Sequence, residues 1–88
     1  MKYQPTNRQM SSVMGDEVVI LNHADGVYYN LEEVGAFVWE KLQSRSMTFD
    51  EIVEIVCEHY EVEATVCKQD IKKLLNDLIK EKLIEGVE

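Results

Sequence analysis

Cysteine, proline and glycine are all scarce in this sequence. Its 88 residues include two cysteines, one proline and four glycines, and they contain no Gly-rich phosphate loop or low-complexity tract. Cys57 and Cys67 both lie among apolar residues in helical patterns, which is typical of packed, reduced thiols rather than of a disulfide or a metal site. The chain therefore depends on a hydrophobic core, and its cysteine usage favours a cytoplasmic protein.

Basic residues and long apolar runs are few as well. Nine Lys and Arg stand against 17 Asp and Glu, which gives a formal net charge of −8. General binding to DNA, RNA or anionic lipid relies on positive charge meeting phosphate, so this balance argues against those partners. The longest aliphatic run, Val18 to Leu21, is far too short to cross a bilayer, and the first ten residues lack the apolar region of a signal peptide. We predict a cytoplasmic protein with no nucleic acid and no membrane among its partners.

Spacings that indicate catalysis or metal binding are also missing. The sequence contains no Cys-x-x-Cys, His-x-x-x-His or Glu-x-x-His. His23 falls in an expected turn, and His59 lies two residues from Cys57, which places the two on different faces of a helix. A core of this size also leaves little room for a buried active site or a large cofactor. We expect a binding protein that is not an enzyme and has no cofactor.

Three strand candidates precede three helix candidates in what we read as a single domain spanning 1–88. The strands are predicted at Arg8–Met14, where the alternation is weak, and at Glu17–Asn22 and Val27–Tyr29. Gly15-Asp16 and Asp25-Gly26 supply the turn residues between them, so we expect an antiparallel meander. Residues 1–7 look extended and loosely held, which leaves an ordered core of about 8–85.

Apolar residues then recur at helical spacing. Helices are expected at 31–43, from 49 to about 60, and from 64 to about 83. Asn30 is predicted to cap the first helix, with Glu33 completing a capping box, and Thr48 with Glu51 forms the same pattern before the second. The order predicts an α+β, winged-helix-like fold in which a three-stranded antiparallel sheet is followed by three helices.

The third predicted strand runs almost directly into a helix, which suggests a sheet edge with a groove beside it. An extended peptide can add a strand to such an edge, and pockets between the strand and the third helix would then select side chains. Tyr28 and Tyr29 suit this role because each combines a broad apolar face with a polar tip. Since alternate strand residues face opposite ways, at most one of them is expected in the core.

Two other functions stay open at this point. A winged-helix DNA-binding regulator would place the third helix in the major groove, and five lysines lie on that helix or at its end: Lys68, Lys72, Lys73, Lys80 and Lys82. The acidic balance argues against this reading, as does the absence of a base-reading cluster, since Gln69 stands alone at the helix start. A bare scaffold for an enzyme is the third reading.

Four segments together resemble the PqqD-like family, whose members are also called RiPP recognition elements. The segments are Gly26-Val-Tyr-Tyr-Asn-Leu31, Glu33-Val-Gly-Ala-Phe-Val-Trp-Glu40, Thr48-Phe-Asp-Glu-Ile-Val53, and Asp70 with Leu74, Leu78 and Leu83-Ile84. The resemblance covers roughly residues 12–85. It implies a βββααα fold without catalytic residues that binds the leader of a ribosomally synthesised precursor peptide. The leader would add a strand to the third predicted strand, beside the third helix.

The resemblance also implies partners and contact residues. The leader would be presented to a modifying or processing enzyme, such as a leader peptidase, a cyclase or a radical-SAM enzyme, and the spacing here looks more like lasso-peptide proteins than the quinone-cofactor protein. The implied peptide-binding residues are Val27, Tyr28, Tyr29, Asn30, Cys67, Lys68, Asp70, Ile71, Leu74 and Leu75. Two questions stay open: which flank of the third helix faces the groove, and whether the exposed edge strand also forms a homodimer.

Overall fold

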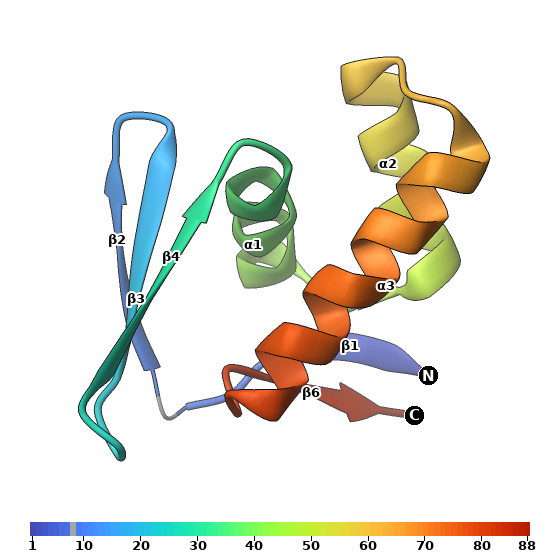
Figure 1. The fold of residues 1–88 in the computed structure, drawn as a ribbon. Coiled ribbons are helices and arrows are strands. Elements are labelled where there is room, and N and C mark those ends of the chain that lie inside the picture. The colour runs from blue at the N-terminus through green and yellow to red at the C-terminus, as the bar shows by residue number, and fades with distance from the viewer. Residues whose placement is uncertain (8) are drawn as a thin grey trace.

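The computed structural model describes residues 1–7 and 9–88 (Figure 1). Their elements are, in chain order, β1 (Lys2–Pro5), β2 (Gln9–Met14), β3 (Glu17–Asn22), β4 (Val27–Glu32), α1 (Val34–Ser44), β5 (Met47–Thr48), α2 (Phe49–Tyr60), α3 (Ala64–Lys80) and β6 (Ile84–Val87). The α+β prediction, with a three-stranded antiparallel sheet ahead of three helices, is confirmed. A second small sheet was not predicted.

The first sheet is the predicted meander, with strand order β2-β3-β4. Met14 pairs with Glu17 across the first turn, and Asn22 pairs with Val27 across the second. Gly15 and Gly26 take φ values of 66° and 71°, a conformation that a residue without Cβ adopts at little cost. Arg8, the predicted start of the first strand, lies outside the described residues.

Strand β4 is longer than predicted, and the expected cap at Asn30 is wrong. The six residues of β3 offer partners as far as Glu17, and Leu31 pairs with Val18 so that both side chains are buried. Burying this apolar pair favours continued strand over an early helix. Helix α1 therefore begins only at Val34, after Glu33, which has a φ of 49° and makes no side-chain cap.

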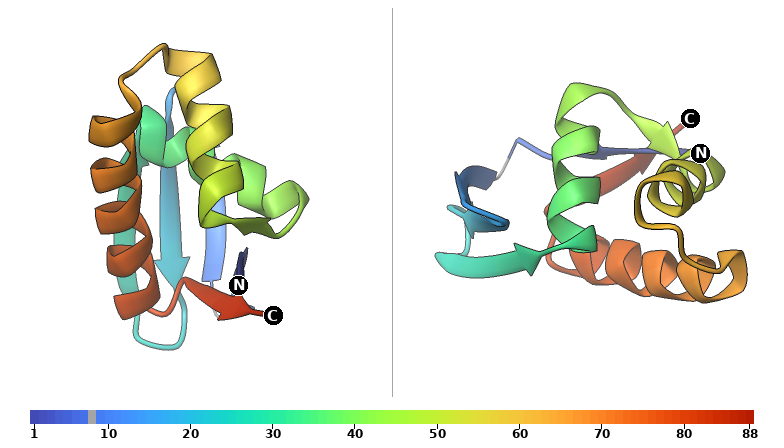
Figure 2. Two further views of the ribbon diagram at one scale, coloured as in Figure 1. Left: turned by 90° about the vertical axis from the view of Figure 1, so that its right-hand side faces the viewer. Right: turned by 90° about the horizontal axis from the view of Figure 1, so that it is seen from above.

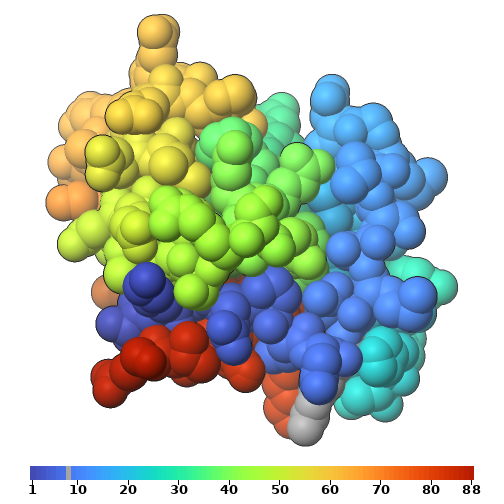
Figure 3. All heavy atoms as spheres, turned by 180° about the vertical axis from the view of Figure 1, so that it is seen from behind, coloured from blue at the N-terminus to red at the C-terminus, as the bar shows by residue number. Residues whose placement is uncertain are grey.

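The second sheet corrects the expectation that residues 1–7 are loosely held. Its strand order is β5-β1-β6, so the N-terminal strand is the central one. Tyr3 pairs with Met47 on one side and Gly86 on the other. Figure 3 shows the first and last strands side by side on the back of the molecule. No local pattern predicts this sheet, because its three strands come from the two ends and the middle of the chain.

One core joins the two sheets and the three helices, and α1 contacts β1, β3, β4 and α2. Its largest fully buried side chains include Trp39, Ile20, Leu42 and Leu78. Helix α3 ends at Lys80, earlier than the predicted 83. Lys82 has a φ of 61°, and the N–H of Leu83 donates to the carbonyl of Leu78 at 2.9 Å, the bonding of a Schellman C-cap. This turn sends the chain into β6.

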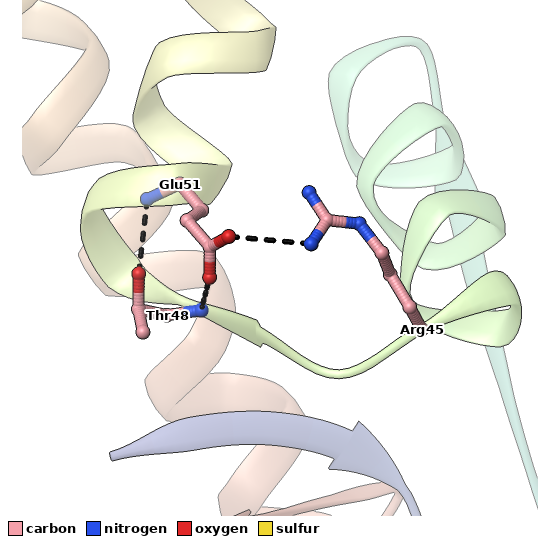
Figure 4. Close-up of polar contacts among 3 residues, drawn as sticks. All are labelled: Arg45, Thr48 and Glu51. Carbon is pink, nitrogen blue, oxygen red and sulfur yellow. Dashed lines mark hydrogen bonds and ion pairs between the residues drawn. The ribbon is translucent and has the colours of Figure 1, made fainter.

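The predicted capping box at the start of α2 is confirmed (Figure 4). The N–H of Glu51 donates to the Thr48 hydroxyl at 3.1 Å, and the N–H of Thr48 donates to the Glu51 carboxylate at 2.9 Å. Arg45 forms an ion pair with the other Glu51 oxygen at 3.2 Å. The backbone bond from Thr48, with smaller help from Arg45, holds the pKa of Glu51 below its ordinary 4.5. The box fixes where α2 begins.

Replacing Thr48 by alanine is expected to lower the free energy of unfolding by about 1 kcal/mol, the usual effect of losing an N-cap hydroxyl. Because the pKa of Glu51 is lowered in the folded state, the contribution of its carboxylate is present above pH 4.5 and is lost as the pH falls through the folded value. Urea titration measures both effects. Thr48→Ser keeps the hydroxyl and should recover most of the loss; a serine variant as unstable as the alanine one would contradict the capping explanation.

Candidate functional site

Strand β4 forms one edge of the first sheet, and among the described residues its only strand partner is β3. The two-residue turn at Gly15-Asp16 makes Met14 and Glu17 a hydrogen-bonded pair. Antiparallel strands alternate the side to which their amides point, so the next residues of β3 that bond to β4 are Val18, Ile20 and Asn22. In the observed register their partners are Leu31, Tyr29 and Val27. The N–H and C=O groups of Tyr28, Asn30 and Glu32 therefore face the open edge.

The side chains of β4 divide between the two faces of the sheet. Tyr29 and Leu31 lie on the core face, with Tyr29 half-buried and Leu31 buried. Tyr28 lies on the outer face and is 70% exposed. The expectation that at most one of the two tyrosines belongs to the core is confirmed. Of the two tyrosines, Tyr29 is the one placed to contact a peptide on the side of α3.

Helix α3 lies beside β4, and Leu74 marks the flank that faces it. A Cβ built on Gly35 would lie 3.2 Å from the Leu31 side chain and 3.7 Å from that of Leu74, so all three residues meet at the start of α1. At the other end, the Asn22 side chain donates to the carbonyl of Glu81 at 3.0 Å. Both views of Figure 2 place β4 and α3 on the same side of the molecule. The edge strand and the helix thus lie side by side, and the surface between them, marked by Tyr29, Leu31 and Leu74, is called the cleft.

A small apolar pocket lies near the N-terminal end of α3, at the end of the cleft where β4 passes into α1. Its volume is about 50 Å³, and its lining residues are Val34, Val56, Val62, Val66, Cys67, Asp70 and Ile71. Pockets for small-molecule substrates are usually about 300–1,000 Å³. This pocket has room for the tip of one apolar side chain, and Asp70 supplies its charged residue.

The opposite end of the cleft is acidic. Burial, and then the charges of Asp77 and Glu81, raise the pKa of Tyr29 above its ordinary 10.0. Asp77, on α3, and Glu81, the residue directly after the helix, are both half-buried. A second acidic pair lies on the outer face of the sheet, where a hydrogen bond with Glu17 and its charge raise the pKa of Glu32. The two ends of the cleft therefore differ in chemistry.

The predicted contact residues of α3 fall in different places. Asp70 and Leu74 lie on the flank that faces β4, whereas Ile71 and Leu75 are buried in the core, with Ile71 also reaching the pocket wall. Lys68 lies two residues from Asp70, about 160° around the helix, and is exposed on the other side. Peptide contact by these residues stays a prediction, and Asp70 and Leu74 are the two of them best placed to make it.

Sequence reasoning missed several residues of the cleft. Val34, Val62 and Val66 line the pocket, and Asp77 lies near Tyr29. Val66 and Asp77 stand four residues before and seven residues after Asp70, so once one residue of the flank is known, helical spacing would have found both. Val34 and Val62 come from other elements, and no local signal points to them.

The cysteines and histidines do not form a reactive centre in the described part of the chain. Burial, and then contact with Cys57, raise the pKa of Cys67 to about 11, so its thiol stays protonated at neutral pH. His59 stacks on Phe37 with ring centroids 4.4 Å apart, at the edge of an open hollow between α1 and α2. Residues 1–7 and 9–88 hold no cluster of three or more His, Cys, Asp or Glu suited to a metal ion. They also include no helix with the length and hydropathy of a membrane span.

Comparison with protein families gives a match over residues 17–84 to coenzyme PQQ synthesis protein D (PqqD). The chain belongs to the PqqD family. The matched region runs from β3 into β6 and so contains both walls of the cleft. No curated protein sequence matches this PqqD-family chain.

Two solved structures are similar to this PqqD-family chain over almost its whole length. One is TbiB1 in complex with the TbiA(beta) leader peptide, which is 29% identical, with a TM-score of 0.87 over 97% of this chain and 98% of that one. The other is lasso peptide synthetase B1 complexed with the leader peptide, which is 19% identical, with a TM-score of 0.83 over 98% and 100% of the two chains. Neither similarity supports the DNA-binding alternative.

Proposed function

We propose that this protein binds the leader segment of a ribosomally synthesised precursor peptide, which adds a strand to β4 in the cleft beside α3. The observation that carries the proposal is the open edge of β4, where the backbone groups of Tyr28, Asn30 and Glu32 lack a strand partner among the described residues. Edge strands with free backbone groups receive extended peptides through main-chain hydrogen bonds. The 29% identity to TbiB1, whose structure holds a leader peptide, supports the same mode here.

Main-chain bonds give register, and side chains give specificity. In an antiparallel addition, alternate leader residues would face α3 and meet the small pocket, Leu74 and Tyr29 in turn. The pocket would take one apolar side chain, and Asp70 at its rim would contact a polar or basic neighbour. Because the contacts that would select side chains are mostly apolar, we expect a leader motif with apolar anchor residues rather than an extended run of charged residues.

The leader would be presented to a separate modifying or processing enzyme, and this chain itself would carry no catalytic step. A lasso-type precursor is the version we propose, because a lasso peptide synthetase B1 component shares the fold and the sequence resembles that type. A homodimer through β4 would occupy the same backbone groups. Self-association and peptide binding would therefore compete, and dilution should favour the peptide.

The test begins with an mRNA-displayed library of random peptides of about twelve residues, since a strand of that length exceeds the span of β4. Selection against the protein should enrich peptides that bind at micromolar concentration or below. On binding, hydrogen exchange at the Tyr28 and Asn30 amides should slow strongly, whereas exchange at exposed amides of α2 should not change. Failure to enrich any peptide, or a bound peptide that leaves both β4 amides unprotected, would overturn the proposal.

A further inference from the structure

The α3 wall of the cleft changes from apolar to acidic along its length. Val66 and Asp70 border the small pocket, Leu74 lies next to Gly35 as Leu31 does, and Asp77 and Glu81 follow. Asp70, Leu74, Asp77 and Glu81 are spaced by four, three and four residues, which keeps them on one face of a helix. Leu74 and Leu31 both lie next to Gly35, which places this face of α3 toward the end of β4.

The position of the acidic end is set by contacts to the first sheet. The Asn22 side chain, buried at 4% exposure, donates to the Glu81 carbonyl at 3.0 Å and accepts from the amides of Ala24 and Asp25. This clamp holds the last turn of α3 against the β3–β4 hairpin. Tyr29, on the core face of β4, lies close enough to Asp77 and Glu81 for their charges to act on its hydroxyl.

Neither acidic group is neutralised within the described part of the chain. Among residues 1–7 and 9–88, the one ion pair within 4.0 Å joins Arg45 to Glu51, far from this cleft. Lys73 and Lys80 stand four residues before and three residues after Asp77 on the helix, but neither ammonium lies within 4.0 Å of the Asp77 carboxylate. Among the described residues, neither half-buried carboxylate has a cation partner within 4.0 Å, and the two like charges, four positions apart, repel each other while partial burial weakens their hydration. A cation placed between them and Tyr29 would relieve both costs.

We propose that the cleft selects peptides with a Lys or Arg that docks beside Tyr29, Asp77 and Glu81, at a set distance from the apolar residue in the pocket. This specificity rests on the proposed peptide-binding function. From the pocket to the midpoint of the two acidic residues, α3 rises by roughly 16 Å at 1.5 Å per residue. A strand covers that distance in about five residues. Both side chains must face α3, so their separation is even, about four or six residues.

The direction of the added strand sets the order of the two side chains. Strand β4 runs from Val27 at the acidic end to Leu31 near the pocket. Every pairing in this sheet is antiparallel, and antiparallel ladders are slightly more stable per residue than parallel ones. An antiparallel peptide therefore places its apolar residue first and its basic residue about four or six positions later.

The test repeats the display selection on three proteins: the natural chain, Asp77→Lys and Glu54→Lys. Glu54 is exposed on α2, so Glu54→Lys changes the net charge equally without touching the cleft. The natural chain and Glu54→Lys should enrich Lys or Arg about four or six positions after an apolar residue. Asp77→Lys, checked for folding by circular dichroism, should lose that basic residue or replace it with Asp or Glu.

A milder variant keeps the proposal testable if Asp77→Lys fails to fold. Asp77→Asn should weaken binding of an enriched peptide by about three- to tenfold, and the same peptide with its Lys or Arg changed to Gln should bind both proteins equally. Enriched peptides that lack the basic position, or equal losses for both peptides, would overturn the specificity and leave strand addition standing. Enrichment of no peptide at all would overturn both proposals.

Discussion

Replacing Asn30 by proline is expected to reduce peptide binding by at least about 10- to 100-fold while leaving the domain folded. Proline has no N–H, and the Asn30 amide is one of those that face the open edge of β4. A bound peptide would meet a proline ring where it needs a donor, and its carbonyl would stay unpaired at a cost of about 1–3 kcal/mol. The β3–β4 ladder is spared because its bonds come from the neighbouring residues Tyr29 and Leu31.

The matched control is Asn30→Ala, which removes the same side chain and keeps the N–H. Isothermal titration of a display-selected peptide should give near-natural affinity for the alanine variant and severe loss for the proline variant. Circular dichroism should show that both are folded. Equal affinities for the two variants would mean that the backbone of β4 is not the peptide-binding group, whatever the peptide contacts elsewhere.

Replacing Trp39 by alanine should lower the free energy of unfolding by about 3–5 kcal/mol, the usual cost of emptying a large aromatic site in a core. Trp39 is the one tryptophan of the chain and is 1% exposed. A domain of this length has a total stability of roughly 4–13 kcal/mol, so this loss removes a large part of the free energy of unfolding.

Phe37→Ala on the same helix is the control for Trp39→Ala. Phe37 is half-buried at the edge of the core and contacts the rings of His59 and Tyr60, so its loss should cost only about 1–2 kcal/mol. Urea titration followed by far-UV circular dichroism measures both, since tryptophan fluorescence is absent from one variant. A smaller loss for Trp39→Ala than for Phe37→Ala would contradict the central place of Trp39 in the core.

Sequence patterns predicted the elements whose signals lie within a few residues. The capping box at Thr48, the turns at Gly15 and Gly26, and the alternation of Tyr28 and Tyr29 all depend on neighbours one to four positions apart. The capping box predicted at Asn30 does not form. Its residue types suit a helix N-cap, but the pairing of Leu31 with Val18 on the neighbouring strand keeps these residues in β4. Local propensity yields where a tertiary contact buries more apolar surface.

For the candidate site, too, local signals were predictable from the sequence and tertiary contacts were not. The sequence pointed to Val27–Tyr29 as an edge strand and to Asp70 and Leu74 as part of its helical wall. It did not reveal Val34, Val62 or Val66 as pocket residues, because three different segments bring them together. The predicted contacts also included Ile71 and Leu75, because the sequence does not separate the core face of α3 from its cleft face. A helical wheel has no reference direction until one contact, here that of Leu74, supplies it.

The sequence by itself determined the order of the three meander strands and the three helices, the acidic balance and the alternation along β4, since each depends on residue type and on near neighbours. Only the tertiary structure decided that the two termini pair across the chain, that Tyr28, Asn30 and Glu32 face outward, and that α3 turns an acidic end toward Tyr29. Those features join residues that are tens of positions apart, and their geometry follows from the packing of one shared core.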